Sequence, residues 1–336
     1  ANFPSGVNVF HRAAQWVAYV RSYGEQTGGL NSPSVLSFLE TSDGSLWVGT
    51  DGGGVNRIRP DGTFEYLTKR GNQGLTADAI LSLAEDRDGH IWIGTWGGGL
   101  NRYDPASGEL TRYPARPEEP GALSHPNIWA ILVDQDNDVW LGTEGGGLSR
   151  YDRETDHFER IPYGETDPRH TAGGIIWSLF QDHQGLIWIG SNSGLSRLDK
   201  KTGEFRHWQH IEGDPLSLSN NTVLAIFEDR QQRMWIGTRA GLNRLHPNGE
   251  TFRVIRTDDG LANDGITSIL QDGEGRLWLG TNNGLASLDP TTEAMRNYQR
   301  TDWASGKFNY GSAIRLQSGE LVFGGTQGFV RFQPRS

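Results

Sequence analysis

The sequence contains no cysteine, which excludes disulfide bonds and thiolate metal sites. It also lacks a long apolar run that could cross a membrane as a helix, and a basic, apolar N-terminal segment typical of a signal peptide. Lys and Arg total 31 against 41 Asp and Glu, and the net charge of −10 argues against nucleic acid as a partner. The absence of cysteine permits an oxidising compartment without requiring one.

Two residue types are abundant instead, namely glycine with 46 copies and tryptophan with 12. A disordered chain would carry fewer aromatic side chains than this one does. The composition therefore indicates a periodic fold.

The period is visible when the chain is aligned on a glycine that follows a tryptophan by two residues. Seven copies of one unit appear, and their spacing runs from 43 to 48 residues. The copies are LWVGTDGGGVNRI (46–58), IWIGTWGGGLNRY (91–103), VWLGTEGGGLSRY (139–151), IWIGSNSGLSRL (187–198), MWIGTRAGLNRL (234–245), LWLGTNNGLASL (277–288) and LVFGGTQGFVRF (321–332). This is the length of one four-stranded propeller blade.

Each copy reads as four short strands separated by turn residues. In the second copy the predicted strands are 80–85, 91–95, 100–103 and 110–113. We therefore predict an all-β fold, a seven-bladed β-propeller with four antiparallel strands per blade, that spans residues 1–336 as a single domain.

Two aligned positions describe the expected packing. Six copies have tryptophan at the anchor position and the seventh has valine, so we expect these side chains to fill the space between blades: Trp47, Trp92, Trp140, Trp188, Trp235, Trp278 and Val322. On the first strand one position is always small, as steric crowding near the axis would require: Ser37, Ser82, Ala130, Ser178, Ala225, Ser268 and Ser312.

The seventh copy supplies three strands and then stops. Residues 16–32 match 63–78, a predicted outer strand with its following loop. We expect residues 16–23 to complete the last blade and close the ring, which removes two open edges. Residues 6–11 also resemble a third strand, so a closure of two strands plus two, with 328–334 displaced, stays open.

The stretch GTWGGGLNRYD (94–104) resembles a phosphate-binding loop, but no helix follows it and the Gly-Lys-Ser/Thr signature is absent. Because the glycines recur between the second and third strands of the blades, we expect a tight turn with positive φ.

The repeated pattern Asp-x-x-Gly-x-apolar-Trp-apolar-Gly-Thr-x-x-Gly-Leu-x-Arg, as in DHQGLIWIGSNSGLSRLD (182–199), resembles the two-component regulator propeller repeat. The resemblance implies a periplasmic or extracellular ligand-sensing domain of a bacterial signal-transduction protein, in several cases one for oligosaccharides. It also implies neighbouring propeller, sandwich, kinase or cyclase modules in a full-length protein. The motif defines the blade, so the resemblance carries over no functional residue.

Loops between second and third strands, and loops between blades, share one face of a propeller, which is the usual binding face. They are longest around the second to fourth blades. We expect a ligand site there that combines aromatic and hydrogen-bonding side chains: Trp96, Trp129, Glu144, Arg169, His170, Trp177 and Asn192. Trp129 and Trp177 have two interpretations, as a plug of the channel or as a ligand contact.

Three functions remain open at this point. The first is a non-catalytic domain that binds a small polar ligand such as an oligosaccharide, without cofactor, metal, nucleic acid or membrane span. The second is a protein–protein interaction platform. The third is a lyase or hydrolase that would use His125, His170 and Glu144 as an acid–base group. The segment DQDND (134–138) spaces its aspartates like a calcium loop, but we expect a plain turn.

Overall fold

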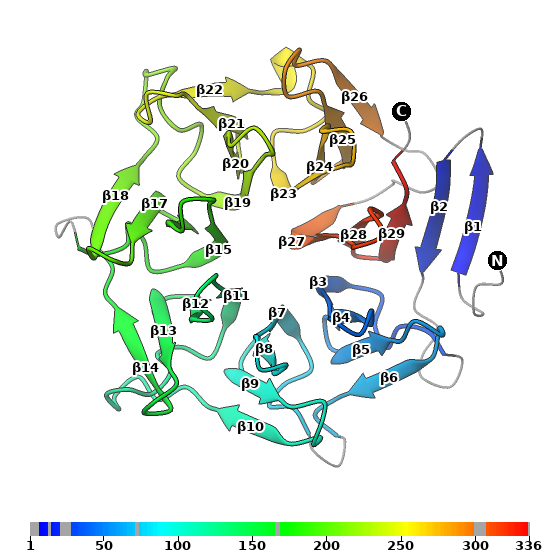
Figure 1. Cartoon of the computed structure of the whole chain (residues 1–336). Coiled ribbons are helices and arrows are strands. Elements are labelled where there is room, and N and C mark those ends of the chain that lie inside the picture. Colours follow the sequence, from blue (N-terminus) through cyan, green and yellow to red (C-terminus); the bar gives the residue numbers. More distant parts are fainter. Residues whose placement is uncertain are drawn as a thin grey trace.

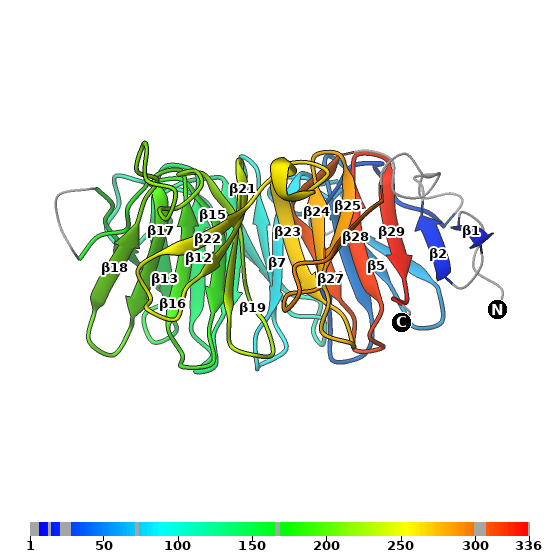
Figure 2. The same cartoon turned by 90° about the horizontal axis from the view of Figure 1, so that it is seen from above.

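The structure is a computed structural model that describes residues 7–12, 15–20, 28–70, 74–164, 169–298 and 307–334, with the backbone alone for the first two ranges. Seven sheets surround a central channel, and in each the first strand lies innermost (Figure 1). Figure 2 shows the ring from its side, with the strands running between the two faces. The predicted seven-bladed β-propeller is confirmed.

Six blades have four antiparallel strands in chain order from the channel outward. The first three blades are β3 (Val35–Glu40), β4 (Leu46–Thr50), β5 (Val55–Ile58), β6 (Phe64–Leu67); β7 (Ile80–Glu85), β8 (Ile91–Thr95), β9 (Leu100–Tyr103), β10 (Leu110–Tyr113); and β11 (Ile128–Val133), β12 (Val139–Thr143), β13 (Leu148–Asp152), β14 (His157–Ile161). The next three are β15 (Ile176–Gln181), β16 (Ile187–Ser191), β17 (Gly194–Asp199), β18 (Glu204–Trp208); β19 (Val223–Glu228), β20 (Met234–Thr238), β21 (Gly241–Leu245), β22 (Phe252–Ile255); and β23 (Ile266–Gln271), β24 (Leu277–Thr281), β25 (Gly284–Leu288), β26 (Met295–Tyr298). A short 3-10 turn, Thr257–Asp259, is the one helical element within the described ranges.

The seventh blade joins both ends of the chain. Its sheet runs β27 (Phe308–Arg315), β28 (Leu321–Gly325), β29 (Gly328–Phe332), β2 (Gln15–Val20) and β1 (Val7–Arg12). Strand β2 pairs antiparallel with β29, so it takes the place of the fourth strand of this blade, as expected. Residues 21–23 of the expected outer strand lie outside the described residues. The segment from residue 7 onward does not displace 328–334 but adds a fifth, outermost strand.

Each anchor tryptophan is held by a hydrogen bond within its own blade. The indole Nε1 of Trp92 donates to Oδ2 of Asp86 over 2.8 Å, and Oδ1 of the same aspartate accepts the backbone N–H groups of Asp88 and His90. Four further blades repeat the bond between tryptophan and aspartate: Trp140–Asp134, Trp188–Asp182, Trp235–Asp229 and Trp278–Asp272. The aspartate of the repeat therefore closes the turn and satisfies a buried indole at once.

The anchors pack between neighbouring blades as predicted. Trp92 is fully buried, and its cluster includes Ile128 and Val139 of the next blade. On the adjacent third strand Arg102 lies opposite Trp92, with its guanidinium carbon 5.6 Å from the ring centroid. Such a cation–π contact explains the arginine of the repeat.

The small first-strand residue faces the anchor glycine of its own sheet. A Cβ atom on Gly94 would lie 2.2 Å from Oγ of Ser82 and 2.9 Å from Cβ of Ile128 in the next blade. The Ser82 hydroxyl also donates to the carbonyl of Ile128 over 2.8 Å. The steric limit thus acts at the contact between blades, whereas the sequence led us to place it at the axis.

The triple glycines form the expected turn. Gly97 and Gly99 have φ of 82° and 76°, and a Cβ on Gly98 would lie 2.8 Å from the backbone carbon of Thr76. The hydroxyl of Thr95 donates to the carbonyl of Gly99 and ties the loop across its base. These glycines serve backbone conformation and close packing against the preceding inter-blade loop.

Candidate functional site

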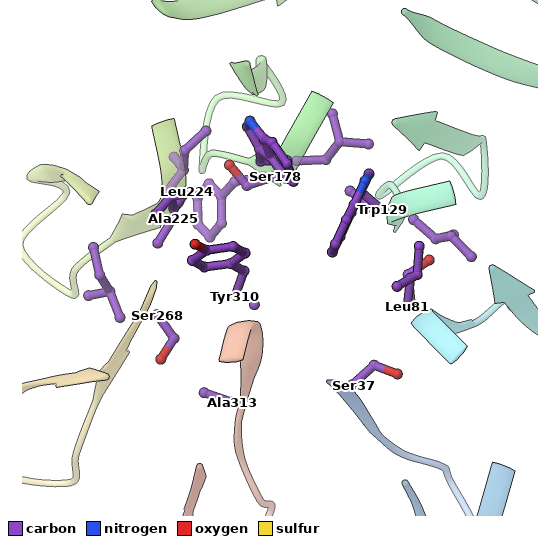
Figure 3. A pocket seen from close by; sticks show the side chains of 18 of the residues that line it. Ser37, Leu81, Trp129, Ser178, Leu224, Ala225, Ser268, Tyr310 and Ala313 are labelled. Atoms are coloured by element: carbon purple, nitrogen blue, oxygen red, sulfur yellow. The ribbon is translucent and has the colours of Figure 1, made fainter. Parts of the chain in front are cut away.

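A cavity of about 310 Å³ occupies the central channel. Its walls come from the innermost strands of all seven blades. The anchor tryptophans lie on the second strands, further from the channel. Figure 3 shows this cavity with Trp129 and Tyr310 reaching into it from different blades. The lining includes the serines of the small position, such as Ser37 and Ser178, and the bulky residues Leu81, Trp129, Trp177, Leu224 and Tyr310.

Trp129 and Trp177 reach the cavity because each lies in a β-bulge. In β11 the pairing with β12 shifts between Ile128 and Ala130, so Trp129 has no partner across the ladder. Trp177 occupies the same place in β15. A bulge re-aims the extra side chain, and here the two indoles from neighbouring blades lie with ring centroids 4.9 Å apart.

The two tryptophans belong to a row of four aromatic side chains. Trp96, on the loop between β8 and β9, meets Trp129 edge to face with centroids 5.9 Å apart. At the other end Trp177 meets Tyr310 of the seventh blade over 6.0 Å. Trp96 is 47% exposed, whereas the other three are half-buried, so the row leads from the loop face into the channel.

Tyr310 is the member of this row that sequence reasoning missed. The seventh blade has a larger bulge, since β27 pairs Phe308 with Gly325 and Ala313 with Phe323, leaving residues 309–312 opposite Gly324. When the first strands are aligned on their small residue, Gly311 and not Tyr310 falls at the position of Trp129 and Trp177. The signal available in the sequence was the segment FNYGSAIR, which is longer than the other first strands.

The indole nitrogens of Trp129 and Trp177 are the unusual polar atoms of the cavity. Both Nε1 atoms are buried without a hydrogen-bond partner. The hydroxyls of Ser178 and Ser268 are also buried without a partner, but they face the anchor glycines Gly190 and Gly280 of their own sheets. By contrast, the hydroxyls of Ser37, Ser82 and Ser312 donate to carbonyl oxygens of the next blade. Buried donors without partners are costly, and a ligand or water with acceptor atoms would satisfy them.

Glu144 joins this region through Asn127. The amide of Asn127 donates to Oε2 of Glu144 over 2.7 Å, and its Oδ1 accepts the backbone N–H of Gly97, which adjoins Trp96. The loops that carry Trp96 and Glu144 are thus linked to each other. Glu144 is half-buried and is not part of the cavity wall.

The remaining predicted site residues lie away from the cavity wall. Asn192 is exposed, and its Oδ1 accepts the backbone N–H of Ile175, one residue before β15. Arg169 and His170 precede Thr171, whose backbone N–H donates to the carbonyl of Pro162 just beyond the outermost strand β14. Neither Arg169 nor His170 lines the cavity.

The structure links only two of the three residues that a lyase or hydrolase would use as an acid–base group, His125 and Glu144, and it links them through Asn127. Nδ1 of His125 accepts the backbone N–H of Asn127 over 3.2 Å, and Glu144 is held by the amide of the same residue. His170 lies on the separate segment described above.

The aspartates of DQDND form a turn whose cation is a lysine. The Lys200 ammonium lies 2.6 Å from Asp134, 2.6 Å from Asp136 and 3.0 Å from Asp138. Burial alone would lower the pKa of Lys200, but hydrogen bonds to these three carboxylates raise it above its ordinary value. An internal ammonium occupies the position that a metal ion would need.

A second acidic group, Asp86 with Asp88 and His90, lies on a turn of the same kind. Arg153 contacts Asp86 over 3.3 Å and Asp88 over 3.1 Å, and Asp86 also accepts the Trp92 indole. The arginine supplies the positive charge here, so the group is explained as an ion pair between blades.

The family comparison identifies the repeat. The profile described as "Two component regulator propeller" matches six segments: residues 29–52, 74–97, 122–145, 172–193, 217–240 and 260–283. It does not match the seventh unit, where Val322 and Leu316 replace the tryptophan and its aspartate. A search of the curated proteins found no match.

Solved structures share the fold at low sequence identity. Virginiamycin B lyase from Staphylococcus aureus is 12% identical with a TM-score of 0.68, over 96% of this chain and all of that one. PorZ, a bacterial surface component of the type-IX secretion system of Porphyromonas gingivalis, is 17% identical with a TM-score of 0.69, over 97% of this chain and 52% of that one. The extracellular domain assigned to a hybrid two component system of B. thetaiotaomicron is 19% identical with a TM-score of 0.49, over 98% of this chain and 56% of that one.

The chain therefore spans about half the length of the last two proteins. Within the described residues, no helix has the length and apolar character that a membrane crossing requires. The repeats, their aspartate–tryptophan bonds and the six profile matches lead to one assignment. The chain is a member of the two component regulator propeller family.

Proposed function

We propose that this propeller is a non-catalytic sensing domain that binds a small polar ligand, such as an oligosaccharide, at the channel mouth. The observation that carries the proposal is the aromatic row that enters the cavity, in which two buried indole N–H groups have no partner. Aromatic faces stack on the apolar faces of sugar rings, and indole donors bind hydroxyl oxygens. The family's description as a two component regulator supports a role in signalling.

In this proposal the ring itself moves little. The signal passes when a ligand favours one arrangement of the propeller with a neighbouring module of the full-length protein, and so shifts its population. A periplasmic or extracellular location fits such a role, and the chain needs no cofactor or metal for it.

The test is calorimetric titration of the protein with a panel of neutral and acidic oligosaccharides. Trp96→Ala removes the exposed end of the aromatic row and should weaken binding at least ~10-fold. Tyr163→Ala is the matched control, because Tyr163 is as exposed as Trp96 (48% against 47%) and is not part of the cavity wall. Equal loss in both variants, or in neither, would contradict the proposed site.

An interaction platform is the second candidate, and exposed apolar side chains between the fourth and fifth blades favour it. Ile211 is 58% exposed and Leu216 is 49% exposed on the loop between β18 and β19. If no saccharide binds, and a double variant Ile211→Ser, Leu216→Ser abolishes self-association or binding of a protein partner, this candidate replaces the first.

A further inference from the structure

We propose that the channel mouth selects an uncharged terminal sugar unit, which binds against the contiguous aromatic row of Trp129, Trp177 and Tyr310. This inference rests on the proposed function and specifies its ligand. It assigns to Tyr310, from the seventh blade, the role of completing a site whose other members come from the second to fourth blades.

The first argument is the absence of charge in the cavity. Among the described residues that line it, none has an ionisable side chain that is charged at neutral pH. A carboxylate placed there would lose its hydration without gaining a counter-charge, which is costly. A neutral hydroxylated ring would suffer no such penalty.

The second argument is the supply of neutral hydrogen-bonding groups. Every first strand lies at the inner end of its sheet and pairs on one side only, so its other backbone edge faces the channel. Such an edge presents N–H and C=O groups without ladder partners. Together with the Nε1 atoms of Trp129 and Trp177, this edge can bind hydroxyl groups in several directions.

The third argument is the size of the cavity. Its volume of about 310 Å³ lies at the lower end of the range for small-molecule sites, roughly 300–1,000 Å³. It can admit the end of an oligosaccharide but not the middle of a longer chain. Trp96, exposed at the outer end of the aromatic row, is placed to stack on the next unit.

The fourth argument is the rigidity of the bulge that carries Tyr310. The amide of Asn309 donates to the carbonyl of Val35 over 2.8 Å, and the hydroxyl of Ser312 donates to the same carbonyl over 3.0 Å. Gly311, with φ of 65°, permits the turn between these two attachments. Tyr310 is thus pre-organised by bonds to the first blade, and little ordering is left to the binding step.

One charged group lies near the mouth of the channel, and it could in principle favour an acidic sugar over a neutral one. The ammonium of the exposed Lys307 is 5.4 Å from the Tyr310 ring centroid. If Lys307 served as a carboxylate receptor, an acidic sugar would bind better than its neutral counterpart, and Lys307→Met would remove that advantage. We expect neither result, because the net charge of −10 opposes anions and Lys307 is not part of the cavity wall.

The experiment uses matched pairs of oligosaccharides that differ only in oxidation at C6: glucose, galactose and mannose oligomers and the corresponding uronic acid oligomers. A cyclic glucose oligomer, which has no end, accompanies the linear one. We expect a neutral linear oligomer to bind, its uronic acid counterpart to bind at least ~100-fold more weakly, and the cyclic oligomer not to compete. Trp129→Phe and Trp177→Phe, which keep a ring and remove the N–H donor, should each weaken binding about 3- to 10-fold.

Tyr310→Ala should weaken binding of the neutral oligomer about 10-fold while the melting temperature stays near that of the parent. A drop in melting temperature without loss of affinity would assign Tyr310 to the plug of the channel and overturn its role. Equal or better binding of an acidic oligomer, or of the cyclic one, would overturn the inference and leave the proposed function standing. If no member of the panel binds, the proposed function fails as well.

Discussion

The indole nitrogen of Trp188 donates a 2.7 Å hydrogen bond to Oδ2 of Asp182, six residues earlier at the start of the turn between β15 and β16. Oδ1 of this aspartate accepts the backbone N–H groups of Gln184 and Leu186 in the turn between them. One carboxylate therefore fixes both the turn and the side chain that fills the space toward the fifth blade. Because five blades repeat this arrangement, it is the unit on which the stability of the ring depends.

Trp188→Ala should lower the free energy of unfolding by about 3–5 kcal/mol, as a large-to-small change in a packed interior. Trp188 is 2% exposed and packs with Leu195, Trp208 and Val223. Trp188→Phe keeps much of the volume, so its smaller cost should reflect mainly the unpaired Asp182 carboxylate. Urea titration measures both, and a loss below about 1 kcal/mol for the alanine variant would contradict the packing described here.

Lys200→Met should destabilise the protein at neutral pH by about 3 kcal/mol, because it leaves three carboxylates without their cation. Burial raises the pKa of Asp134, but hydrogen bonds from Lys200, Trp140 and the turn lower it below its ordinary value. A lowered folded-state pKa adds stability above the unfolded value of about 3.9, and this stability is lost as the pH falls through the folded-state pKa.

The difference between the parent and Lys200→Met should therefore be largest near pH 7 and should narrow below about pH 4. Lys201→Met is the matched control, since Lys201 is exposed and its neighbour carries the ion pairs. Thermal unfolding between pH 3 and pH 8 provides the comparison. A constant difference across this range would show that the three carboxylates do not depend on Lys200.

Removal of residues 1–23 should expose an outer edge of the last blade. Strand β2 covers the edge of β29, with Val17 opposite Phe332 and Val20 opposite Phe329. The uncovered edge of β29 would expose backbone groups that pair with other molecules, so the truncated protein should aggregate. Size-exclusion chromatography measures the association of the truncated protein, and thermal unfolding measures its stability. A monomeric product with an unchanged melting temperature would show that the N-terminal strands are not needed for a stable ring.

Gly98→Ala should cost about 1–3 kcal/mol, because the added Cβ would lie 2.6 Å from Oγ1 and 2.8 Å from the backbone carbon of Thr76. Gly97→Ala is the comparison: it has open space but a φ of 82°, and conformational strain alone should cost about 1 kcal/mol. We expect the larger loss at Gly98 in urea titrations. The reverse order would mean that backbone strain, not close packing, governs this loop.

The repeat itself determined the blades. A pattern such as DRDGHIWIGTWGGGLNRYD predicts turns and strands from neighbouring residues alone, and strands 80–85, 91–95, 100–103 and 110–113 occur at the predicted residues. Repetition then identifies the fold, because equivalent units that bury the same face must pack alike. Trp96, Trp129 and Trp177 could be selected from the sequence because they differ from the residues at the equivalent positions of other blades.

Other features depend on contacts between distant parts of the chain. Tyr310 meets Trp177 because the ring brings the seventh blade toward the fourth across the channel and a bulge extends the first strand. Lys200 reaches Asp134 of the preceding blade, and β1 adds a fifth strand to the last sheet. The sequence period describes only what the blades have in common. These contacts join residues that differ between blades and are far apart in the chain, so only the tertiary structure decided them.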